Sequence, residues 1–144
     1  MKSWYGVFWV IFFLLFAMSG NSQWIYGGGM KYNTNTEFKA IALQAKVGKD
    51  ISEKFDLNAD LAYYIRSKAT WSVDIDLHYK LFNINDKLII NPVAGINFTK
   101  TDVINNSLGL GASIRVPDER YTYYFEPKWI LDNSQFVLNV GVLF

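Results

Sequence analysis

The feature that most constrains the fold of this chain is an alternation of apolar and polar residues that recurs in one segment after another. It is clearest in residues 71–81, where Trp71, Val73, Ile75 and three further apolar residues occupy every second position. Ser, Asp, His and Lys fill the positions between them. Because side chains alternate between the two faces of a β-strand, this period of two predicts strands rather than helices.

Eight segments show the pattern, and clusters of Asn, Asp, Ser, Thr, Lys or Pro separate them, as is typical of turns. Connections this short allow only antiparallel neighbours, so the segments form an up-and-down meander. Pro92 and Pro127 fall inside two segments, where we expect either bulges or earlier strand ends. The predicted strands are residues 24–33, 38–51, 57–65, 71–81, 88–99, 108–116, 121–129 and 135–144.

The two faces of these strands distinguish a membrane barrel from a soluble one. One face is almost purely aliphatic and aromatic, whereas the other carries Gly, Asn and charged residues. Small polar side chains suit the crowded lumen of an eight-stranded barrel, and the apolar face suits lipid. A soluble, lipocalin-like barrel would have the opposite arrangement. The predicted fold is therefore an all-β, eight-stranded antiparallel up-and-down transmembrane β-barrel, with an aromatic belt near each rim.

The N-terminal region predicts a cleavable signal peptide. Lys2 supplies a positive charge, residues 7–18 are twelve consecutive apolar residues, and small and polar residues follow. A permanent helical anchor would need roughly 20 apolar residues. We expect a signal peptide at residues 1–22, with cleavage after Ser22 or alternatively after Ser19, and a barrel domain at residues 23–144.

Charge and cysteine content exclude several classes of function. The chain has 14 basic and 13 acidic residues, and Lys2 is the only charged residue before Gln23, so 13 of each sign remain after cleavage. A neutral chain offers no electrostatic basis for binding nucleic acid. The absence of cysteine excludes disulfides and thiolate metal sites.

The last strand carries the most specific motif. Apolar side chains recur at every second position up to an aromatic at the end: Phe136, Leu138, Val140, Val142 and Phe144. This pattern resembles the C-terminal assembly signal of outer-membrane proteins, and residues 23–144 as a whole resemble the small OmpA/OmpX-like eight-stranded barrels. The resemblance implies location in the bacterial outer membrane, both termini in the periplasm, and recognition by the barrel assembly machinery. Outer loops are usually the longer set, but the longest predicted here has about seven residues.

The polar face supplies the candidate functional residues. Ionisable groups inside a barrel must be paired, so we predict a lumen network of ion pairs. Its predicted members are Lys46, Asp60, Asp74, Asp76, His78, Lys80, Arg115, Glu126 and Lys128.

His78 is the only histidine, and Asp74 and Asp76 share its face, which raises acid–base chemistry or metal binding as alternatives. A metal site needs more converging ligands, and general-base catalysis needs a positioned nucleophile. Ser72 lies on the same face but roughly 20 Å away along the strand. Barrel enzymes that modify lipid A place such groups at the lipid-facing or outer rim, whereas His78 faces inward. We expect no catalytic, cofactor or metal site.

These observations favour a structural or interaction role in the outer membrane. Expected partners are membrane lipid, lipopolysaccharide and an unidentified protein, with no nucleic acid. Alternatives are a rim or lumen module that binds a small ligand or lipopolysaccharide, and a narrow pore. Basic residues at the predicted outer rim could contact lipopolysaccharide phosphates: Lys39, Arg66, Lys68 and Lys100.

Overall fold

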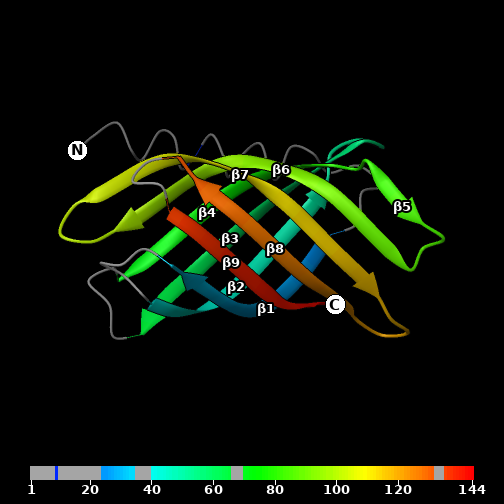
Figure 1. Ribbon diagram of the computed structural model, residues 1–144, viewed down its shortest axis with the longest axis horizontal. Coiled ribbons are helices and arrows are strands. Elements are labelled where there is room, and N and C mark those ends of the chain that lie inside the picture. The colour runs from blue at the N-terminus through cyan, green and yellow to red at the C-terminus, as the bar shows by residue number, and fades with distance from the viewer. Residues whose placement is uncertain (1–8, 10–23, 35–39, 66–69, 132–134) are drawn as a thin grey trace.

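The computed structural model describes residues 9, 24–34, 40–65, 70–131 and 135–144, and in this part of the chain almost every residue from Trp24 onward lies in a strand. The strands wrap into a barrel (Figure 1). They are β1 (Trp24–Asn33), β2 (Ala40–Asp50), β3 (Phe55–Ile65), β4 (Trp71–Tyr79), β5 (Phe82–Ile84), β6 (Leu88–Lys100), β7 (Ile104–Pro117), β8 (Thr122–Ile130) and β9 (Gln135–Leu143).

Each strand pairs antiparallel with its neighbours in the order β4-β3-β2-β1-β9-β8-β7-β6-β5. An additional β4–β6 pairing, in which Trp71 lies opposite Lys100, closes the sheet. The first and last strands are joined through β1–β9, with Gly27 opposite Leu143. Because β4 and β5 are successive parts of one stretch of wall beside β6, the barrel has eight strands around its circumference, and the predicted fold is confirmed.

A bulge separates β4 from β5. His78 lies opposite Val93 and Phe82 lies opposite Ile90, so four steps along one strand match three along the other. The additional residue falls at Lys80–Leu81. A bulge of this kind bends the strand and increases its twist, which directs β5 away from the line of β4.

The expected bulges at the two prolines are absent from β6 and β8. Pro92 keeps its place in the β6–β7 register, opposite Ala112, and Pro127 keeps its place opposite Leu138 in β9. Pairing between β7 and β8 is interrupted beside Pro127 and resumes in the same register. The bulge near Pro92 lies on the neighbouring strand instead. Because β4 ends there, no residue of β4 needs the backbone N–H that Pro92 lacks.

Polar and apolar residues are distributed inside out relative to a soluble protein. Charged and amide side chains of all eight wall strands are buried in the lumen, whereas the outward faces are apolar. Leu43, Leu61, Tyr63 and Leu108 are each 57–61% exposed. A soluble monomer seldom exposes apolar surface so extensively. The lumen is therefore polar and the outer wall suits lipid, as the alternation predicts.

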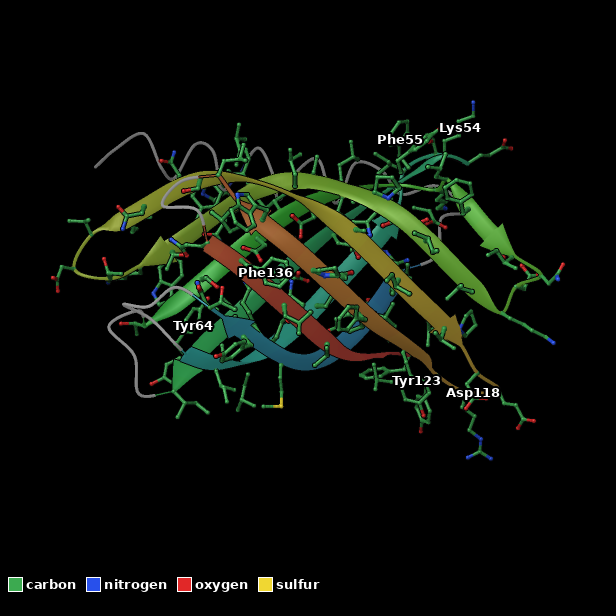
Figure 2. All side chains as sticks on the ribbon, viewed as in Figure 1. Lys54, Phe55, Tyr64, Asp118, Tyr123 and Phe136 are labelled. Carbon is green, nitrogen blue, oxygen red and sulfur yellow. The ribbon has the colours of Figure 1, made fainter. Side chains whose placement is uncertain are left out.

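Aromatic side chains lie near both rims of the wall. At the end where β1 begins and β9 stops, called the termini end, Trp24 stacks on Tyr26 at 6.5 Å and Phe55 contacts Tyr79 at 5.2 Å between ring centroids. Trp129 and Phe136 pair at 6.4 Å towards the other end, called the opposite end. Figure 2 shows Phe55 and Tyr123 at the termini end and Tyr64 at the opposite end.

One connection is shorter than predicted. The expected seven-residue loop after residue 99 reduces to residues 101–103, because β6 continues to Lys100 and β7 begins at Ile104. The predicted signal peptide, apart from Trp9, and the connections around residues 35–39, 66–69 and 132–134 lie outside the described residues. No helix among the described residues is both long and apolar enough to cross a membrane.

Candidate functional site

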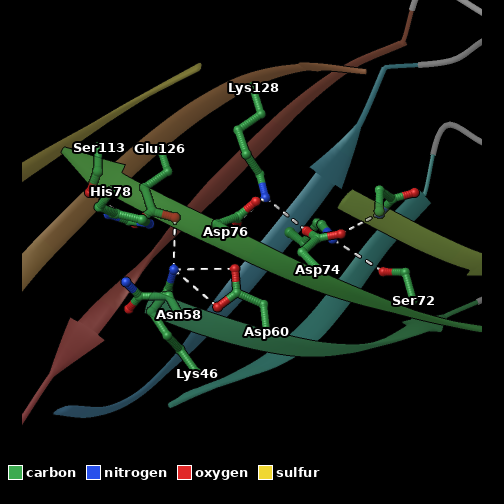
Figure 3. Close-up of polar contacts among 12 residues, drawn as sticks. Lys46, Asn58, Asp60, Ser72, Asp74, Asp76, His78, Ser113, Glu126 and Lys128 are labelled. Carbon is green, nitrogen blue, oxygen red and sulfur yellow. Dashed lines mark hydrogen bonds and ion pairs between the residues drawn. The ribbon is translucent and has the colours of Figure 1, made fainter. Parts of the chain in front are cut away.

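The centre of the lumen holds ion pairs that connect strands on different sides of the barrel (Figure 3). The Lys128 Nζ of β8 lies 2.9 Å from Asp74 Oδ2 and 2.6 Å from Asp76 Oδ2, both on β4. The Lys31 Nζ of β1 lies 2.5 Å from the same Asp74 oxygen and donates to Ser72 Oγ at 3.1 Å. Asn97 of β6 donates its amide to the other Asp74 oxygen. Asp74 of β4 therefore contacts side chains from three other strands, β1, β6 and β8.

A second group is centred on Lys46 of β2. Its Nζ lies 3.0 Å from Asp60 Oδ1 and 2.8 Å from Glu126 Oε2, and it sits 4.9 Å above the centre of the Tyr124 ring. Ser113 of β7 donates to the other Glu126 oxygen at 2.9 Å. All of these side chains are buried, so the group joins β2, β3, β7 and β8 through the lumen.

His78 and Arg115 lie nearer the termini end. The Arg115 guanidinium is 3.1 Å from His78 Nδ1. Because a guanidinium only donates, His78 Nδ1 accepts and the ring proton resides on Nε2, which lies 4.0 Å from Glu126 Oε1. Arg115 Nη1 is also 3.6 Å from Asp56 Oδ2. His78 is thus enclosed by an arginine and two carboxylates.

The structure places eight of the nine predicted network residues in the buried lumen. Lys80 is the exception and corrects the prediction, because it lies at the termini end and pairs at 2.7 Å with Asp50, its side chain 32% exposed. It begins the bulge that ends β4, so the alternation no longer directs it into the lumen.

The lumen also holds two charged residues that the predicted network lacks: Lys31 and Asp56. Both are fully buried. Lys31 follows Gly27 and Gly29 on the inward face of β1, and Asp56 precedes Asn58 and Asp60 on that of β3, so strict use of the alternation would have found both.

Charges within the lumen nearly cancel. Five buried carboxylates share the lumen with four permanently charged side chains and His78: Asp56, Asp60, Asp74, Asp76 and Glu126 with Lys31, Lys46, Arg115 and Lys128. A fifth buried cation, Lys49, lies over the Trp24 ring, with its Nζ 4.9 Å from the ring centroid. Removal of a charge from water is unfavourable unless the charge is paired and hydrogen-bonded. The near-equality of the two sets therefore explains how so many ionised groups are accommodated in a narrow lumen.

Glycines make room for the ring of Tyr124, which faces this network. A Cβ at Gly141 would collide with the Tyr124 ring and with the backbone carbonyl of Gly28 in β1. A Cβ at Gly29 would meet the Tyr124 hydroxyl. Glycine lets another group approach the backbone closely, so these two positions in β9 and β1 accommodate Tyr124.

Three carboxylates come close enough to suggest a cation site. One oxygen from each of Asp60, Asp74 and Asp76 lies within 4.8 Å of the others. Lys46 is already paired with Asp60, and Lys128 with both of the other two. The lysine ammonium groups thus balance the charge of the three carboxylates in the place of a metal ion, as expected for ion pairs that stabilise the fold.

The termini end opens into two adjoining cavities. One, of about 330 Å³, lies beside β5, and the other, of about 290 Å³, lies beside the β7–β8 turn. Ile25, Ile89 and Arg115 line both. The mouth is therefore hollow and partly apolar, in contrast to the ion-paired centre of the lumen.

No protein-family model matches the chain, and no curated protein matches it. Solved structures do. The N-terminal β-barrel domain of Pseudomonas aeruginosa OprF superposes with a TM-score of 0.63 at 13% identity, over 86% of this chain and 96% of that one. A de novo designed transmembrane β-barrel gives 0.60 at 19% identity, over 84% and 92%. The Yersinia pestis outer-membrane protein Ail, in a phospholipid bilayer nanodisc, gives 0.55 at 12% identity, over 88% and 99%.

These likenesses cover almost the whole of each related barrel, and they are likenesses of fold. Together with the paired charges inside and the apolar wall outside, they give this chain the architecture of the small eight-stranded transmembrane β-barrels, the fold that the resemblance to OmpA/OmpX-like proteins implies.

Proposed function

We propose that this chain is a small integral protein of the bacterial outer membrane, with a structural or interaction role and without catalysis. The observation that carries the proposal is the inverted polarity of the closed barrel. Its lumen holds buried ion pairs, and its outer wall exposes aliphatic and aromatic side chains on every strand. Only a lipid environment makes such a wall favourable.

The residues around His78 argue against catalysis. Its Nδ1 accepts from Arg115, and its Nε2 faces Glu126 within the lumen. Glu126 Oε2 is paired with Lys46, and the hydroxyl that donates to Glu126 Oε1, that of Ser113, is fully buried in the lumen. General acid–base chemistry requires a base within reach of the reacting proton, and a lipid substrate outside the wall does not reach His78.

The ion pairs also argue against a conducting pore. Lys31, Lys46 and Lys128 extend into the lumen from three strands and meet carboxylates there. The interior of an eight-stranded barrel is just wide enough for side chains to fill it, and here they fill its centre. Water and ions would have to displace these pairs in order to pass.

Two sequence patterns supply the proposed targeting signals. Residues 1–22 act as the cleaved signal peptide, and the alternate apolar residues of β9 together with Phe144, which follows β9, act as the signal read by the barrel assembly machinery. Both termini then lie in the periplasm, and the connections of the opposite end face the outside. Lipopolysaccharide is the expected lipid neighbour there, with exposed Lys100 at that rim; Lys39, Arg66 and Lys68 lie outside the described residues.

The test is localisation and heat-dependent gel mobility of the full chain produced in a Gram-negative host. We expect the protein in the outer-membrane fraction, with faster migration in SDS before boiling than after it, because closed membrane barrels resist SDS. Mass analysis of lipid A from the same cells should match that from cells with an empty vector. A soluble protein with a single band, or modified lipid A, would contradict the proposal.

A further inference from the structure

The short strand β5 has an unpaired edge. It pairs with β6 on one side only, and the last backbone hydrogen bond towards β3 runs from the Lys80 N–H to the Lys54 carbonyl at 2.7 Å. Within the part of the chain that the structure describes, residues 81–84 have no backbone partner on that side. Figure 1 shows β5 projecting from the right-hand end of the barrel, beyond β4. An open strand edge is a template for another strand.

The edge is held in a fixed conformation. Asn85 and Asp86 adopt positive φ values of 52° and 55°, and Lys87 N–H donates to the Ile84 carbonyl at 3.0 Å. Two-residue turns of this kind match the twist of the strands they join. Asn83 adds two hydrogen bonds to Asp86. The β5–β6 hairpin is therefore ordered before any partner arrives.

A cavity lies directly beside this edge. It has a volume of about 330 Å³, and Leu81, Phe82 and Asn83 line one side of it while Ile25 of β1 lines another. Leu81 and Phe82 are 47% and 56% exposed. The site thus joins a backbone edge to an apolar surface that one or two side chains of a partner could cover.

The floor of the cavity contains buried polar atoms without hydrogen-bond partners among the described residues. These are Asp56 Oδ2, Asn91 Oδ1 and Arg115 Nε, and all three side chains line the cavity and are at least nine-tenths buried. Two acceptors and one donor can pair with the polar atoms of an uncharged side chain that enters the cavity. Such atoms are seldom left unsatisfied in native proteins.

Charges in the cavity are already compensated. Lys80 pairs with Asp50 at 2.7 Å, and Arg115 Nη1 faces Asp56 at 3.6 Å. A strongly charged occupant would find no excess of the opposite sign. An uncharged occupant fits better.

We propose that β5 and this cavity bind an extended, uncharged peptide segment of a partner protein by β-strand addition, in which the main chain pairs with the β5 edge and a side chain enters the cavity. A second copy of the chain does not fit, because the cavity lies within the mouth between β5 and β1, and a closed barrel wall does not enter it. The inference rests on the proposed interaction role and names the kind of partner for it.

The experiment uses thiol capture, since the chain has no cysteine of its own. Leu81→Cys places one thiol at the edge, and Val103→Cys places a matched thiol at the exposed turn of the opposite end. Each variant of the full chain is placed in phospholipid nanodiscs, so that both ends are accessible. The probe is the acetylated and amidated heptapeptide Thr-Val-Thr-Cys-Thr-Val-Thr, activated as its 5-thio-2-nitrobenzoate disulfide.

We expect the mixed disulfide to form about tenfold faster at Leu81→Cys than at Val103→Cys, after correction for reaction with activated free cysteine, because docking raises the effective concentration. N-methylation of every valine and threonine in the peptide should abolish the difference. Equal rates for the two cysteine variants, or an unchanged rate with the N-methylated peptide, would overturn the inference. Formation of disulfide-linked barrel dimers instead of the mixed disulfide with the peptide would overturn it as well. A heat-dependent gel shift recorded on the same samples shows whether the barrel itself is folded, so a failure of docking is distinguishable from a failure of the proposed function.

Discussion

Lys128 and Asp76 form a 2.6 Å ion pair between β8 and β4, two strands that are not neighbours in the wall. The same ammonium group reaches Asp74 at 2.9 Å (Figure 3). The pair therefore connects separate parts of the wall through the lumen, where backbone hydrogen bonds do not reach. Networks of this kind hold the barrel together from within.

Removal of this cation should destabilise the barrel strongly. Lys128→Met leaves Asp76 buried without its ammonium partner, and breaking a buried pair in this way typically costs about 3–5 kcal/mol in the free energy of unfolding. Urea unfolding in lipid vesicles measures the change. The double variant Lys128→Met with Asp76→Asn should recover part of the loss.

The matched control is Lys80→Met, which breaks the partly exposed pair with Asp50 at the mouth. Pairs in contact with water contribute only about 0–1 kcal/mol. Equal losses for Lys128→Met and Lys80→Met would show that the lumen is as well solvated as the mouth.

The close approach of Tyr124 to Gly141 predicts that Gly141→Ala destabilises the fold. The added Cβ would collide with the Tyr124 ring and with the β1 backbone, and overpacking of this kind costs about 1–3 kcal/mol. Gly28→Ala is the control, because its Cβ would face outward and meet only the Gln44 carbonyl, at 3.6 Å. Alanine in a strand is about 0.5–1 kcal/mol more favourable than glycine, so Gly28→Ala should be neutral or stabilising in the same unfolding measurement. A larger loss for Gly28→Ala would show that the two faces of β1 are wrongly assigned.

An arginine in the middle of the outer wall should be unfavourable if that wall contacts lipid. Leu61 is central in β3 and 57% exposed, so Leu61→Arg should lower the free energy of unfolding in bilayers by about 2–4 kcal/mol. Val103→Arg at the exposed turn of the opposite end should change it little. Equilibrium unfolding in vesicles compares the two, and indistinguishable values would contradict a lipid-facing position for Leu61.

The terminal aromatic should matter more for assembly in cells than for the finished barrel. Phe144→Ser removes the last residue of the proposed assembly signal, whereas Tyr123→Ser removes another outward aromatic of the same rim. We expect a several-fold drop in the heat-shifted form in cells for Phe144→Ser only, and comparable unfolding free energies for both variants after refolding in vitro. Equal yields in cells would leave Phe144 without a role in assembly.

The sequence alone determined the strand count, the antiparallel order and the face of nearly every residue, because period-two alternation is a local property that each segment carries by itself. It also indicated which charges face inward, since Lys46, Asp60 and Glu126 occupy polar positions in clearly alternating strands. The same alternation also assigns Lys31 and Asp56 to the inward face.

Only the tertiary structure decided which lumen charges meet. Lys128 of β8 pairs with Asp76 of β4 because closure of the sheet brings those strands face to face across the lumen, and no local pattern contains that distance. The same holds for the bulge at Lys80–Leu81, which follows from how β6 runs past the end of β4 beside Pro92. Local periodicity assigns each side chain to a face, whereas closure and register determine its partner and leave the β5 edge open.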